Sequence, residues 1–199
     1  MSHDVTQWDG MPSRVGNRGL LIVDAPNVDA TVGRMHGRTP RRHERFDPSV
    51  LGAWATDVLG PNAELTLFTN VPDPLPRGLE GWIKSLVEGG WRVYARPKKM
   101  AGDDIDDAMV AHLTSNTWSS VVVFSHDSMC FAQPLQDLAA SGSTITVLGF
   151  RECAGSLSQL QGIRFVDVDD VTGLYQTPPP RIRVADVPAD GGWIEWAVR

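Results

Sequence analysis

Six short apolar runs, separated by stretches of helical pattern, most constrain how this chain can fold. Leu, Ile, Val and Phe dominate the runs, which predict strands over 19–25, 64–70, 91–97, 120–127, 144–150 and 163–170. The first and fourth are almost unbroken, as expected of strands covered on both faces. Apolar residues recur every three to four positions in between, which predicts helices over 47–60, 78–90, 103–113 and 131–142. This alternation predicts an α/β fold with three layers, α/β/α, around a central, mainly parallel sheet of five to six strands.

Cap residues support the expected helix ends. Asp47 is a reasonable N-cap, Pro48 suits the first helical position, and Gly60 follows the last turn of the same helix. Pro134 must lie in the first turn of the helix over 131–142, because a proline deeper in a helix removes a hydrogen bond.

The composition fits one globular domain with short extensions. The chain has 199 residues, of which 42% are hydrophobic and 21% are charged. We expect a polar N-terminal arm at 1–18, the domain at 19–175, and a proline-rich tail at 176–199 that its two tryptophans lay on the domain. No apolar run approaches the ~20 residues that span a membrane, and the N-terminus lacks an apolar signal core, so we expect a cytoplasmic protein. The edge strands or the tail could support a homodimer or a protein partner.

The charge and the cysteines exclude some classes of protein. A formal net charge of −6 argues against a surface built entirely for nucleic acid, although a local basic patch is compatible with it. Cys130 and Cys153 are the two cysteines, and their number and spacing suggest neither a disulfide framework nor a zinc site.

Polar side chains gather after the expected strands, where ligands bind in open parallel sheets. These residues are Asp24 and Asn27 after the first strand, Thr69 and Asn70 after the second, Asp103, Asp104, Asp106 and Asp107 after the third, and Ser125 and Asp127 after the fourth. Clustered carboxylates repel one another, and a hard cation such as Mg²⁺ or Mn²⁺ offsets that repulsion through its preference for oxygen ligands. A cation held by acids can activate water and neutralise a phosphate, as phosphodiester hydrolysis requires.

Simpler roles are open to each of these acids. A single Asp that ends a strand, such as Asp24, is usually a cap or turn residue. Asp103 and Asp106 fit an N-cap and a first-turn acid that meet a helix dipole. Asp104 and Asp107 share a helix face, and their spacing does not decide which of them points into a site.

Two histidines lie near the expected site. His112 falls in the middle of a helix, where we expect it to be packed or hydrogen-bonded rather than a metal ligand. His126 lies beside Asp127 and could contact a phosphate, although one loop histidine is weak evidence.

Two basic segments flank the expected acidic pocket. The first, 33–46, has glycine and proline content that predicts a loop, and it carries Arg34, Arg38, Arg41, Arg42 and Arg45 with His36 and His43. The second, 96–99, adds Arg96, Lys98 and Lys99 after the third strand. Such segments are often plain solvated loops, but their position beside the acids favours a polyanion that is guided to a metal.

Several motifs together resemble the NYN domain family, which belongs to the PIN-like nuclease folds. The opening "LLIVDAPNVD" resembles that family's apolar strand followed by Asp-x-x-Asn. Similar segments follow in the family's order, over about 19–171: "ARPKKMAGDDIDDAMVAHL", "VVVFSHDSMCFAQPLQDLAASGSTITVLGF" and "RFVDVDDV".

The resemblance implies a PIN-like, metal-dependent ribonuclease that uses Mg²⁺ or Mn²⁺. By position, Asp24, Asp104 and Asp127 would be the catalytic acids that hold the metal. Asn27 would hold the first turn, and Ser125 would steady the loop that carries Asp127. From their charge and position, rather than from the resemblance, the candidates to bind RNA are Arg34, Arg38, Arg41, Arg42, Lys98 and Lys99, although the loop at 33–46 could instead bind a protein. Asn70 and His126, by their position after strands, are candidates to support the site.

The sequence departs from the family pattern after the fourth strand. Where the family commonly has Ser-Gly-Asp-x-Asp-Phe, this chain has "SHDSMCF", so His126 replaces the glycine and Met129 or Cys130 replaces the second acid. Asp106 or Asp107 could supply the missing carboxylate as a metal ligand. Without a replacement the site would be slow or idle, and the chain would be a module that binds RNA or a protein partner without cutting.

Two other enzyme classes fit less well. A dinucleotide-dependent oxidoreductase needs glycines after the first strand, and "DAPNVD" has none. A haloacid-dehalogenase-like phosphatase needs an Asp-x-Asp pair, and Asp24 is followed by Ala25 and Pro26.

Overall fold

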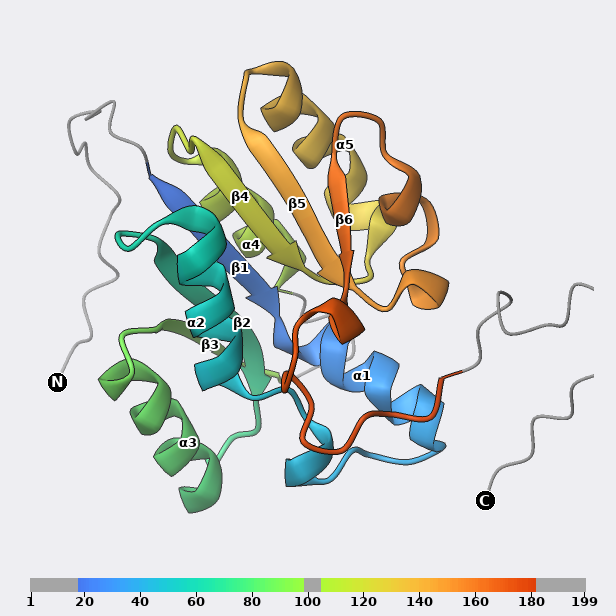
Figure 1. The fold of residues 1–199 in the computed structure, drawn as a ribbon. Coiled ribbons are helices and arrows are strands. Elements are labelled where there is room, and N and C mark those ends of the chain that lie inside the picture. The colour runs from blue at the N-terminus through green and yellow to red at the C-terminus, as the bar shows by residue number, and fades with distance from the viewer. Residues whose placement is uncertain (1–17, 99–104, 182–199) are drawn as a thin grey trace, which may run out of the picture.

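A single parallel sheet forms the centre of the protein. The structure is a computed structural model and describes residues 18–98 and 105–181. Its strands are β1 (Gly19–Asp24), β2 (Glu64–Val71), β3 (Arg92–Pro97), β4 (Ser120–Phe124), β5 (Thr144–Gly149) and β6 (Arg164–Asp167). They lie in the order β3-β2-β1-β4-β5-β6, and every neighbouring pair is parallel (Figure 1). The expected α/β class and the strand number are confirmed.

Helices cover both faces of the sheet, as the three-layer prediction requires. One face is covered by α1 (Ala25–His36), α2 (Pro48–Leu59) and α3 (Arg77–Glu88), and the other by α4 (Asp106–Thr114) and α5 (Ser128–Ala140) (Figure 1). Short 3₁₀ turns complete the fold as η1 (Arg42–Glu44), η2 (Arg151–Cys153), η3 (Gly155–Gln159) and η4 (Val168–Asp170).

Alternation along the central strand builds a separate core on each face. In β1, Leu21 and Val23 join the buried cluster under α1, α2 and α3, whereas Leu20 and Ile22 join the cluster under α4 and α5. All four side chains are fully buried, which explains why this run is unbroken in the sequence. The apolar side chains of α4 face the sheet, because Met109 and Leu113, with Ile105 just before the helix, lie in the second cluster.

The prediction of a loop after the first strand was wrong for 33–36. Helix α1 begins directly after β1 and ends at His36, so the basic segment is a loop only from Gly37 onward. Pro26 lies in the first turn, where its missing N–H has no partner to lose, and Gly37 ends the helix in the left-handed conformation with φ of 64°. Gly33 is not a loop residue: a Cβ there would lie 3.2 Å from the carbonyl oxygen of Arg38.

The end of β4 and the start of α5 also differ from expectation. Strand β4 ends at Phe124 rather than at 127, because the backbone N–H groups of His126 and Asp127 donate to the side chains of Asn27 and Ser125 and not to a neighbouring strand. Helix α5 begins at Ser128, three residues before the predicted start. Pro134 therefore lies inside the helix and not in its first turn.

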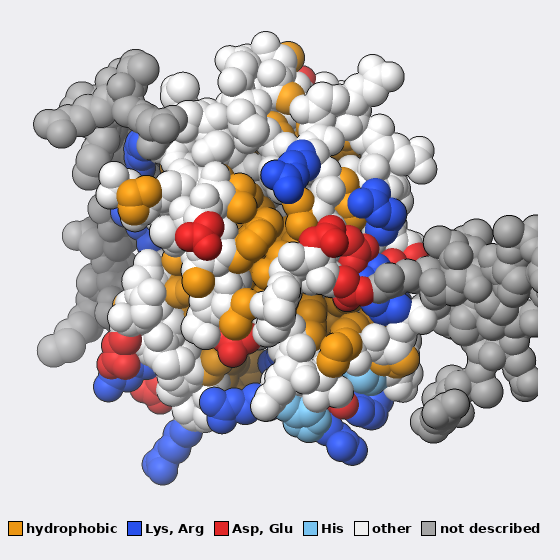
Figure 2. Space-filling view, in the orientation of Figure 1, with side chains coloured by type: hydrophobic (Ala, Val, Ile, Leu, Met, Phe, Trp, Pro, Cys, Tyr) orange, Lys and Arg blue, Asp and Glu red, His pale blue; other side chains and the backbone are white. Residues whose placement is uncertain are grey.

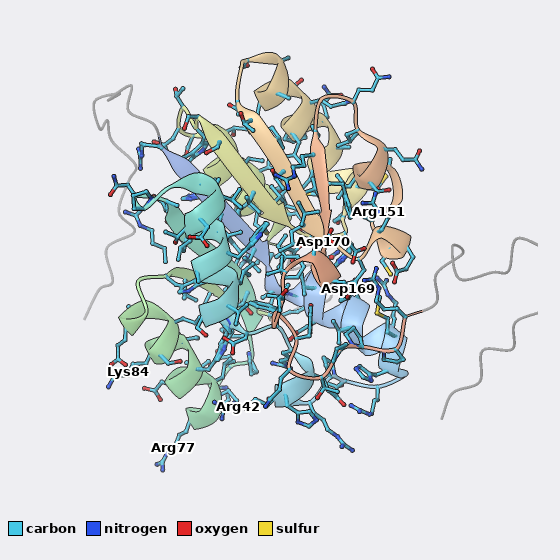
Figure 3. All side chains as sticks on the ribbon, in the orientation of Figure 1. Arg42, Arg77, Lys84, Arg151, Asp169 and Asp170 are labelled. Atoms are coloured by element: carbon cyan, nitrogen blue, oxygen red, sulfur yellow. The ribbon has the colours of Figure 1, made fainter. Side chains whose placement is uncertain are left out.

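The chain after β6 returns to the segment beside η1. Asp47 N donates to the Leu174 carbonyl at 2.7 Å, and Thr177 N donates to the His43 carbonyl at 3.2 Å. Arg181 then binds Glu152, Asp167 and Asp169 and lies over the ring of Phe150. Figure 2 shows acidic and basic side chains gathered at this place, and Figure 3 labels Asp169 and Asp170 there. The first residues of the expected tail thus pack on the domain, while both tail tryptophans lie outside the described residues.

Two further predictions can be checked on the fold. His112 is buried and its Nε2 lies 2.9 Å from Oε1 of Glu64, which confirms a packed and hydrogen-bonded histidine. Within 18–98 and 105–181, no helix is long and apolar enough to cross a membrane.

Candidate functional site

The sheet has its topological switch point between β1 and β4. The chain moves outward from β1 through β2 and β3 on one side, and through β4, β5 and β6 on the other. Val23 pairs with Phe124, so Asp24 and Ser125 follow side by side at the carboxyl ends of the two central strands. In open α/β sheets this position is where ligands bind.

Asp24 is both a helix cap and a buried acid at the switch point. Its Oδ1 accepts a hydrogen bond from the backbone N–H of Asn27 at 3.1 Å, which caps α1. Its Oδ2 accepts a hydrogen bond from the Ser125 hydroxyl at 2.9 Å. Only 3% of Asp24 is exposed. The cap role considered from sequence is therefore confirmed, and the same carboxylate lies where a site is expected.

Ser125 joins Asp24 to the second acid. The backbone N–H of Asp127 donates to the Ser125 oxygen at 3.1 Å, so one hydroxyl contacts both acidic residues. Asp127 caps α5 through Oδ1, which accepts from Met129 N at 2.9 Å and from Cys130 N at 3.1 Å. In the part of the chain that the structure describes, Oδ2 of Asp127 accepts no hydrogen bond. Oδ1 of Asp127 is therefore used to cap α5, and Oδ2 is available to a ligand.

Asn27 and His126 lock α1 to the loop after β4. Oδ1 of Asn27 accepts from the backbone N–H of His126 at 2.9 Å and lies 3.1 Å from Nδ1 of its ring. Nε2 of the same ring accepts from the backbone N–H of Phe150 at 2.9 Å. Because Nε2 is the acceptor, the proton of the neutral ring is on Nδ1, which donates to Asn27. Both ring nitrogens are therefore used within the protein, and neither is directed at a phosphate.

Burial keeps His126 neutral. Burial and, to a smaller extent, the charge of Arg34 lower the pKa of His126 to about 4. The ring stacks on Phe150 at 5.4 Å, and a Cβ on Gly149 would lie 3.1 Å from its Nε2. Gly149 thus makes room for the imidazole of His126. His126 is a positioning residue, and Gly149 at the end of the adjacent strand β5 is the residue whose lack of a side chain permits this packing.

Asn70 brings an amide without a described partner to the carboxyl edge of the sheet, where Asp24 and Ser125 also lie. Phe68 pairs with Asp24, and Asn70 follows two residues later at the carboxyl end of β2, where it also lines a pocket formed with residues of α1 and α3. Nδ2 of Asn70 is buried, and it has no hydrogen-bond partner among the described residues. Buried amides are nearly always paired, so this donor calls for a partner that the described residues do not supply.

The acids of α4 are only partly described. Asp107 is exposed in the first turn of α4, and Asp106 lies next to it. Asp103, Asp104 and Lys99 lie outside the described residues. Among those described, no three His, Cys, Asp or Glu side chains group closely enough to hold a metal ion. The described chain offers two carboxylates, Asp24 and Asp127, and their oxygens are the donors that a hard cation prefers.

The basic residues fall into two groups. Arg34, Arg41 and Arg42 are exposed, and Figure 3 shows Arg42 projecting at the same end of the molecule as Arg77. Arg38 instead forms two hydrogen bonds with the buried Glu44, at 2.7 and 2.5 Å. These bonds and the N–H of Arg41 hold the pKa of Glu44 at about 2. Arg38 thus shapes the loop, whereas the exposed arginines are available to a polyanion.

A pocket that the sequence did not predict lies beside the cap of α1. Its volume is about 300 Å³, and Ala25 and Pro26 form one side of it. Its other lining side chains include Asp29, Arg45, Phe46, Leu79, Trp82 and Lys98. From sequence, Trp82 and Leu79 belong to the apolar stripe of their helix. Their position near α1 depends on how α3 packs, which local patterns do not show.

Comparison with known proteins supports the fold and gives no activity. No protein-family model matches the chain, and no curated protein matches it. Among solved structures, a protein of unknown function from Vibrio parahaemolyticus is similar, with a TM-score of 0.58 and 17% sequence identity. The match covers 80% of this chain and 98% of that one. The three-layer α/β/α fold is thus shared with a known structure.

Proposed function

We propose that this protein is an NYN-like ribonuclease that hydrolyses RNA phosphodiester bonds with Mg²⁺ or Mn²⁺ at the carboxyl edge of its sheet. The observation that carries the proposal is the single hydroxyl of Ser125, which contacts Asp24 and the loop of Asp127 at the switch point. A buried carboxylate and a half-exposed one are thereby held together at the place where open sheets bind ligands. A cytoplasmic location is part of the proposal.

Each residue has a defined part in this mechanism. Asp24, Asp104 and Asp127 would hold the cation, and Asp107 is the candidate for a further carboxylate. The cation, when bound, would supply an activated water and would neutralise charge on the phosphate. The buried amide of Asn70 suits a phosphate oxygen, because it has a donor without a partner among the described residues. Asn27, fixed by His126, keeps the turn after Asp24 in place.

Basic side chains would guide the RNA. Arg34, Arg41 and Arg42 are exposed near the end of α1, and Lys98 follows β3 at the same edge of the sheet. A local field of this kind attracts a polyanion even on a protein with a net charge of −6. Lys99 would belong to the same group.

One observation favours a second candidate, a nuclease-like module that binds RNA or a protein without cutting. Met129 is one of the two residues, with Cys130, that replace the second acid of the family motif, and Met129 is 94% exposed at the start of α5. An exposed thioether beside Asp127 gives no metal ligand of the kind Mg²⁺ uses, but it gives a partner an apolar contact.

Calorimetric titration with Mn²⁺ and cleavage of a mixed RNA pool test the proposal. We expect wild type to bind Mn²⁺ and cleave RNA, and Asp24→Asn and Asp127→Asn to lose both. Asp47→Asn is the matched control, because Asp47 also caps a helix that begins with proline but lies at the start of α2. It should keep full activity. Equal cleavage by all four proteins would reject the proposal, and RNA binding without Mn²⁺ binding would favour the module.

A further inference from the structure

The pocket beside α1 opens at the edge of the sheet that carries the acids. Ala25 and Pro26, which line it, directly follow Asp24 in the chain. Lys98 lies on its other side, immediately after β3, and its N–H extends the ladder to the carbonyl of Val71 at 3.0 Å. A nucleic acid strand that crosses the carboxyl edge therefore passes both the switch point and the mouth of this pocket.

Asp29 is the unusual polar group of the pocket. It lies one turn into α1, with 30% of its side chain exposed, and Nη2 of Arg45 is 3.3 Å from its Oδ2. Within the described chain its carboxylate accepts no hydrogen bond. Burial raises the pKa of Asp29, and Arg45 opposes that rise. A partly buried carboxylate that accepts no hydrogen bond from the described residues suits a ligand with two N–H or O–H donors.

The rest of the lining suits a flat aromatic ring and an anion. Trp82 and Leu79 of α3 form an apolar wall, and the face of an indole can stack on a base. Arg45 is paired with Asp29, whereas Lys98 forms no ion pair with the other described residues that line the pocket. An aromatic wall, a carboxylate and a cation are the groups that a nucleotide would use.

Guanine is the base that fits this donor pattern. Its Watson–Crick edge carries two adjacent donors, N1–H and the N2 amino group, whereas the other three bases present an acceptor beside each donor. A carboxylate accepts both guanine donors at once, and basic side chains donate to the O6 and N7 atoms of guanine. Arg45 lies beside Asp29 and can supply such a donor.

We propose that this pocket holds a guanine base of the RNA strand, with its Watson–Crick edge on Asp29, its ring against Trp82 and a phosphate on Lys98. The assignment of RNA as the source of the base rests on the proposed function. The pocket is then the place where sequence preference is determined, separate from the acids that act on the phosphodiester.

Binding of the four nucleoside 5′-monophosphates, measured by calorimetry in EDTA, tests the pocket without any catalytic step. We expect guanosine monophosphate to bind about tenfold or more tightly than the adenosine, cytidine and uridine compounds. Asp29→Asn should remove the preference for guanosine monophosphate. Trp82→Leu should lower the affinity for every nucleotide that binds to wild type. Asp57→Asn, an exposed acid on α2, and Tyr175→Phe, a hydroxyl whose pKa is raised by burial and by Asp29, are matched controls that should bind as wild type does.

The outcomes separate this inference from the ribonuclease proposal. Asp24→Asn should bind guanosine monophosphate normally, because Asp24 does not line the pocket. Loss of RNA cleavage in Asp24→Asn, with equal binding of all four nucleotides to wild type, would overturn the guanine pocket alone. A preference for guanine that depends on Asp29, with cleavage unaffected by Asp24→Asn, would overturn the ribonuclease alone. No nucleotide binding at millimolar concentration would also reject the pocket.

Discussion

The Ser125 hydroxyl donates a 2.9 Å hydrogen bond to Asp24 across a separation of 101 positions in the chain. The same oxygen accepts a hydrogen bond from Asp127 N, so it fixes the distance between two helix caps. One small side chain therefore connects the two halves of the sheet at their carboxyl edge.

Replacement of Ser125 by alanine should destabilise the protein and lower its activity together. The hydroxyl is fully buried, and its loss removes one donor from the carboxylate of Asp24 and one acceptor from the N–H of Asp127. We expect a loss of about 2 kcal/mol in the free energy of unfolding, measured with urea at pH 7. Ser156→Ala, at an exposed position, should change it by less than about 0.5 kcal/mol. Similar values for both variants would contradict a structural role for the Ser125 hydrogen bonds.

Protonation of His126 should make the protein less stable in mild acid. Since burial lowers the folded pKa to about 4 from 6.5, the unfolded chain binds a proton that the folded chain does not bind in this range. The contribution is fully present above about pH 6.5 and is lost as the pH falls toward 4. We expect wild type to lose about 3 kcal/mol more than His126→Gln between pH 7 and pH 4, from urea unfolding at each pH. Parallel pH profiles for the two proteins would refute the buried neutral ring.

Replacement of Asn70 by alanine should separate stability from activity. Its buried Nδ2 has no partner among the described residues, so its removal takes away an unpaired donor and not a hydrogen bond. We expect the free energy of unfolding to change by less than about 1 kcal/mol, while RNA cleavage falls about tenfold or more. Destabilisation with unchanged cleavage would mean that Asn70 has a structural role instead.

The exposed arginines and Arg38 should behave differently toward RNA. Arg41→Ala combined with Arg42→Ala removes two exposed cations, and we expect the slope of log affinity against log salt to fall by about 1.4 for single-stranded RNA. Arg38→Ala should leave that slope unchanged and lower the thermal midpoint, because it removes both hydrogen bonds from the side chain of Arg38 to Glu44. Fluorescence anisotropy at several KCl concentrations measures the slope. If the slope falls for Arg38→Ala and does not fall for the double variant, Arg38 contacts the RNA and the exposed pair does not.

The central strands of the sheet could be predicted from the sequence because they are buried on both faces. The run 19–25 is unbroken up to Asp24, the run 144–150 begins with Thr alternating with Ile and Val, and the real strands match both runs to within a residue. Helix α1 could not be predicted in the same way, since Pro26 and Gly33 are ordinary signals of a turn. Their roles, at a first turn and at a close approach to Arg38, depend on the neighbours that folding brings.

The candidate site was only partly readable for a related reason. Asp24 and Asp127 follow strands, so their common edge follows from topology alone. The link through Ser125 and the use of both nitrogens of His126 depend on contacts across about 100 residues. The pocket between α1 and α3 depends on helix packing, and Asp29 has no local signal that separates it from any exposed helical acid.

The pairing of β1 with β4 also has a consequence for a chain that is still being made. The first three strands leave the ribosome long before β4, and until then β1 has an unpaired edge on that side. Asp24 is present in this nascent half-sheet, but Ser125 and Asp127 arrive only with the second half. The acids therefore come together only after β4 and the loop that follows it have been made, and a chain that ends before Asp127 has no assembled acidic site near the message that encodes it.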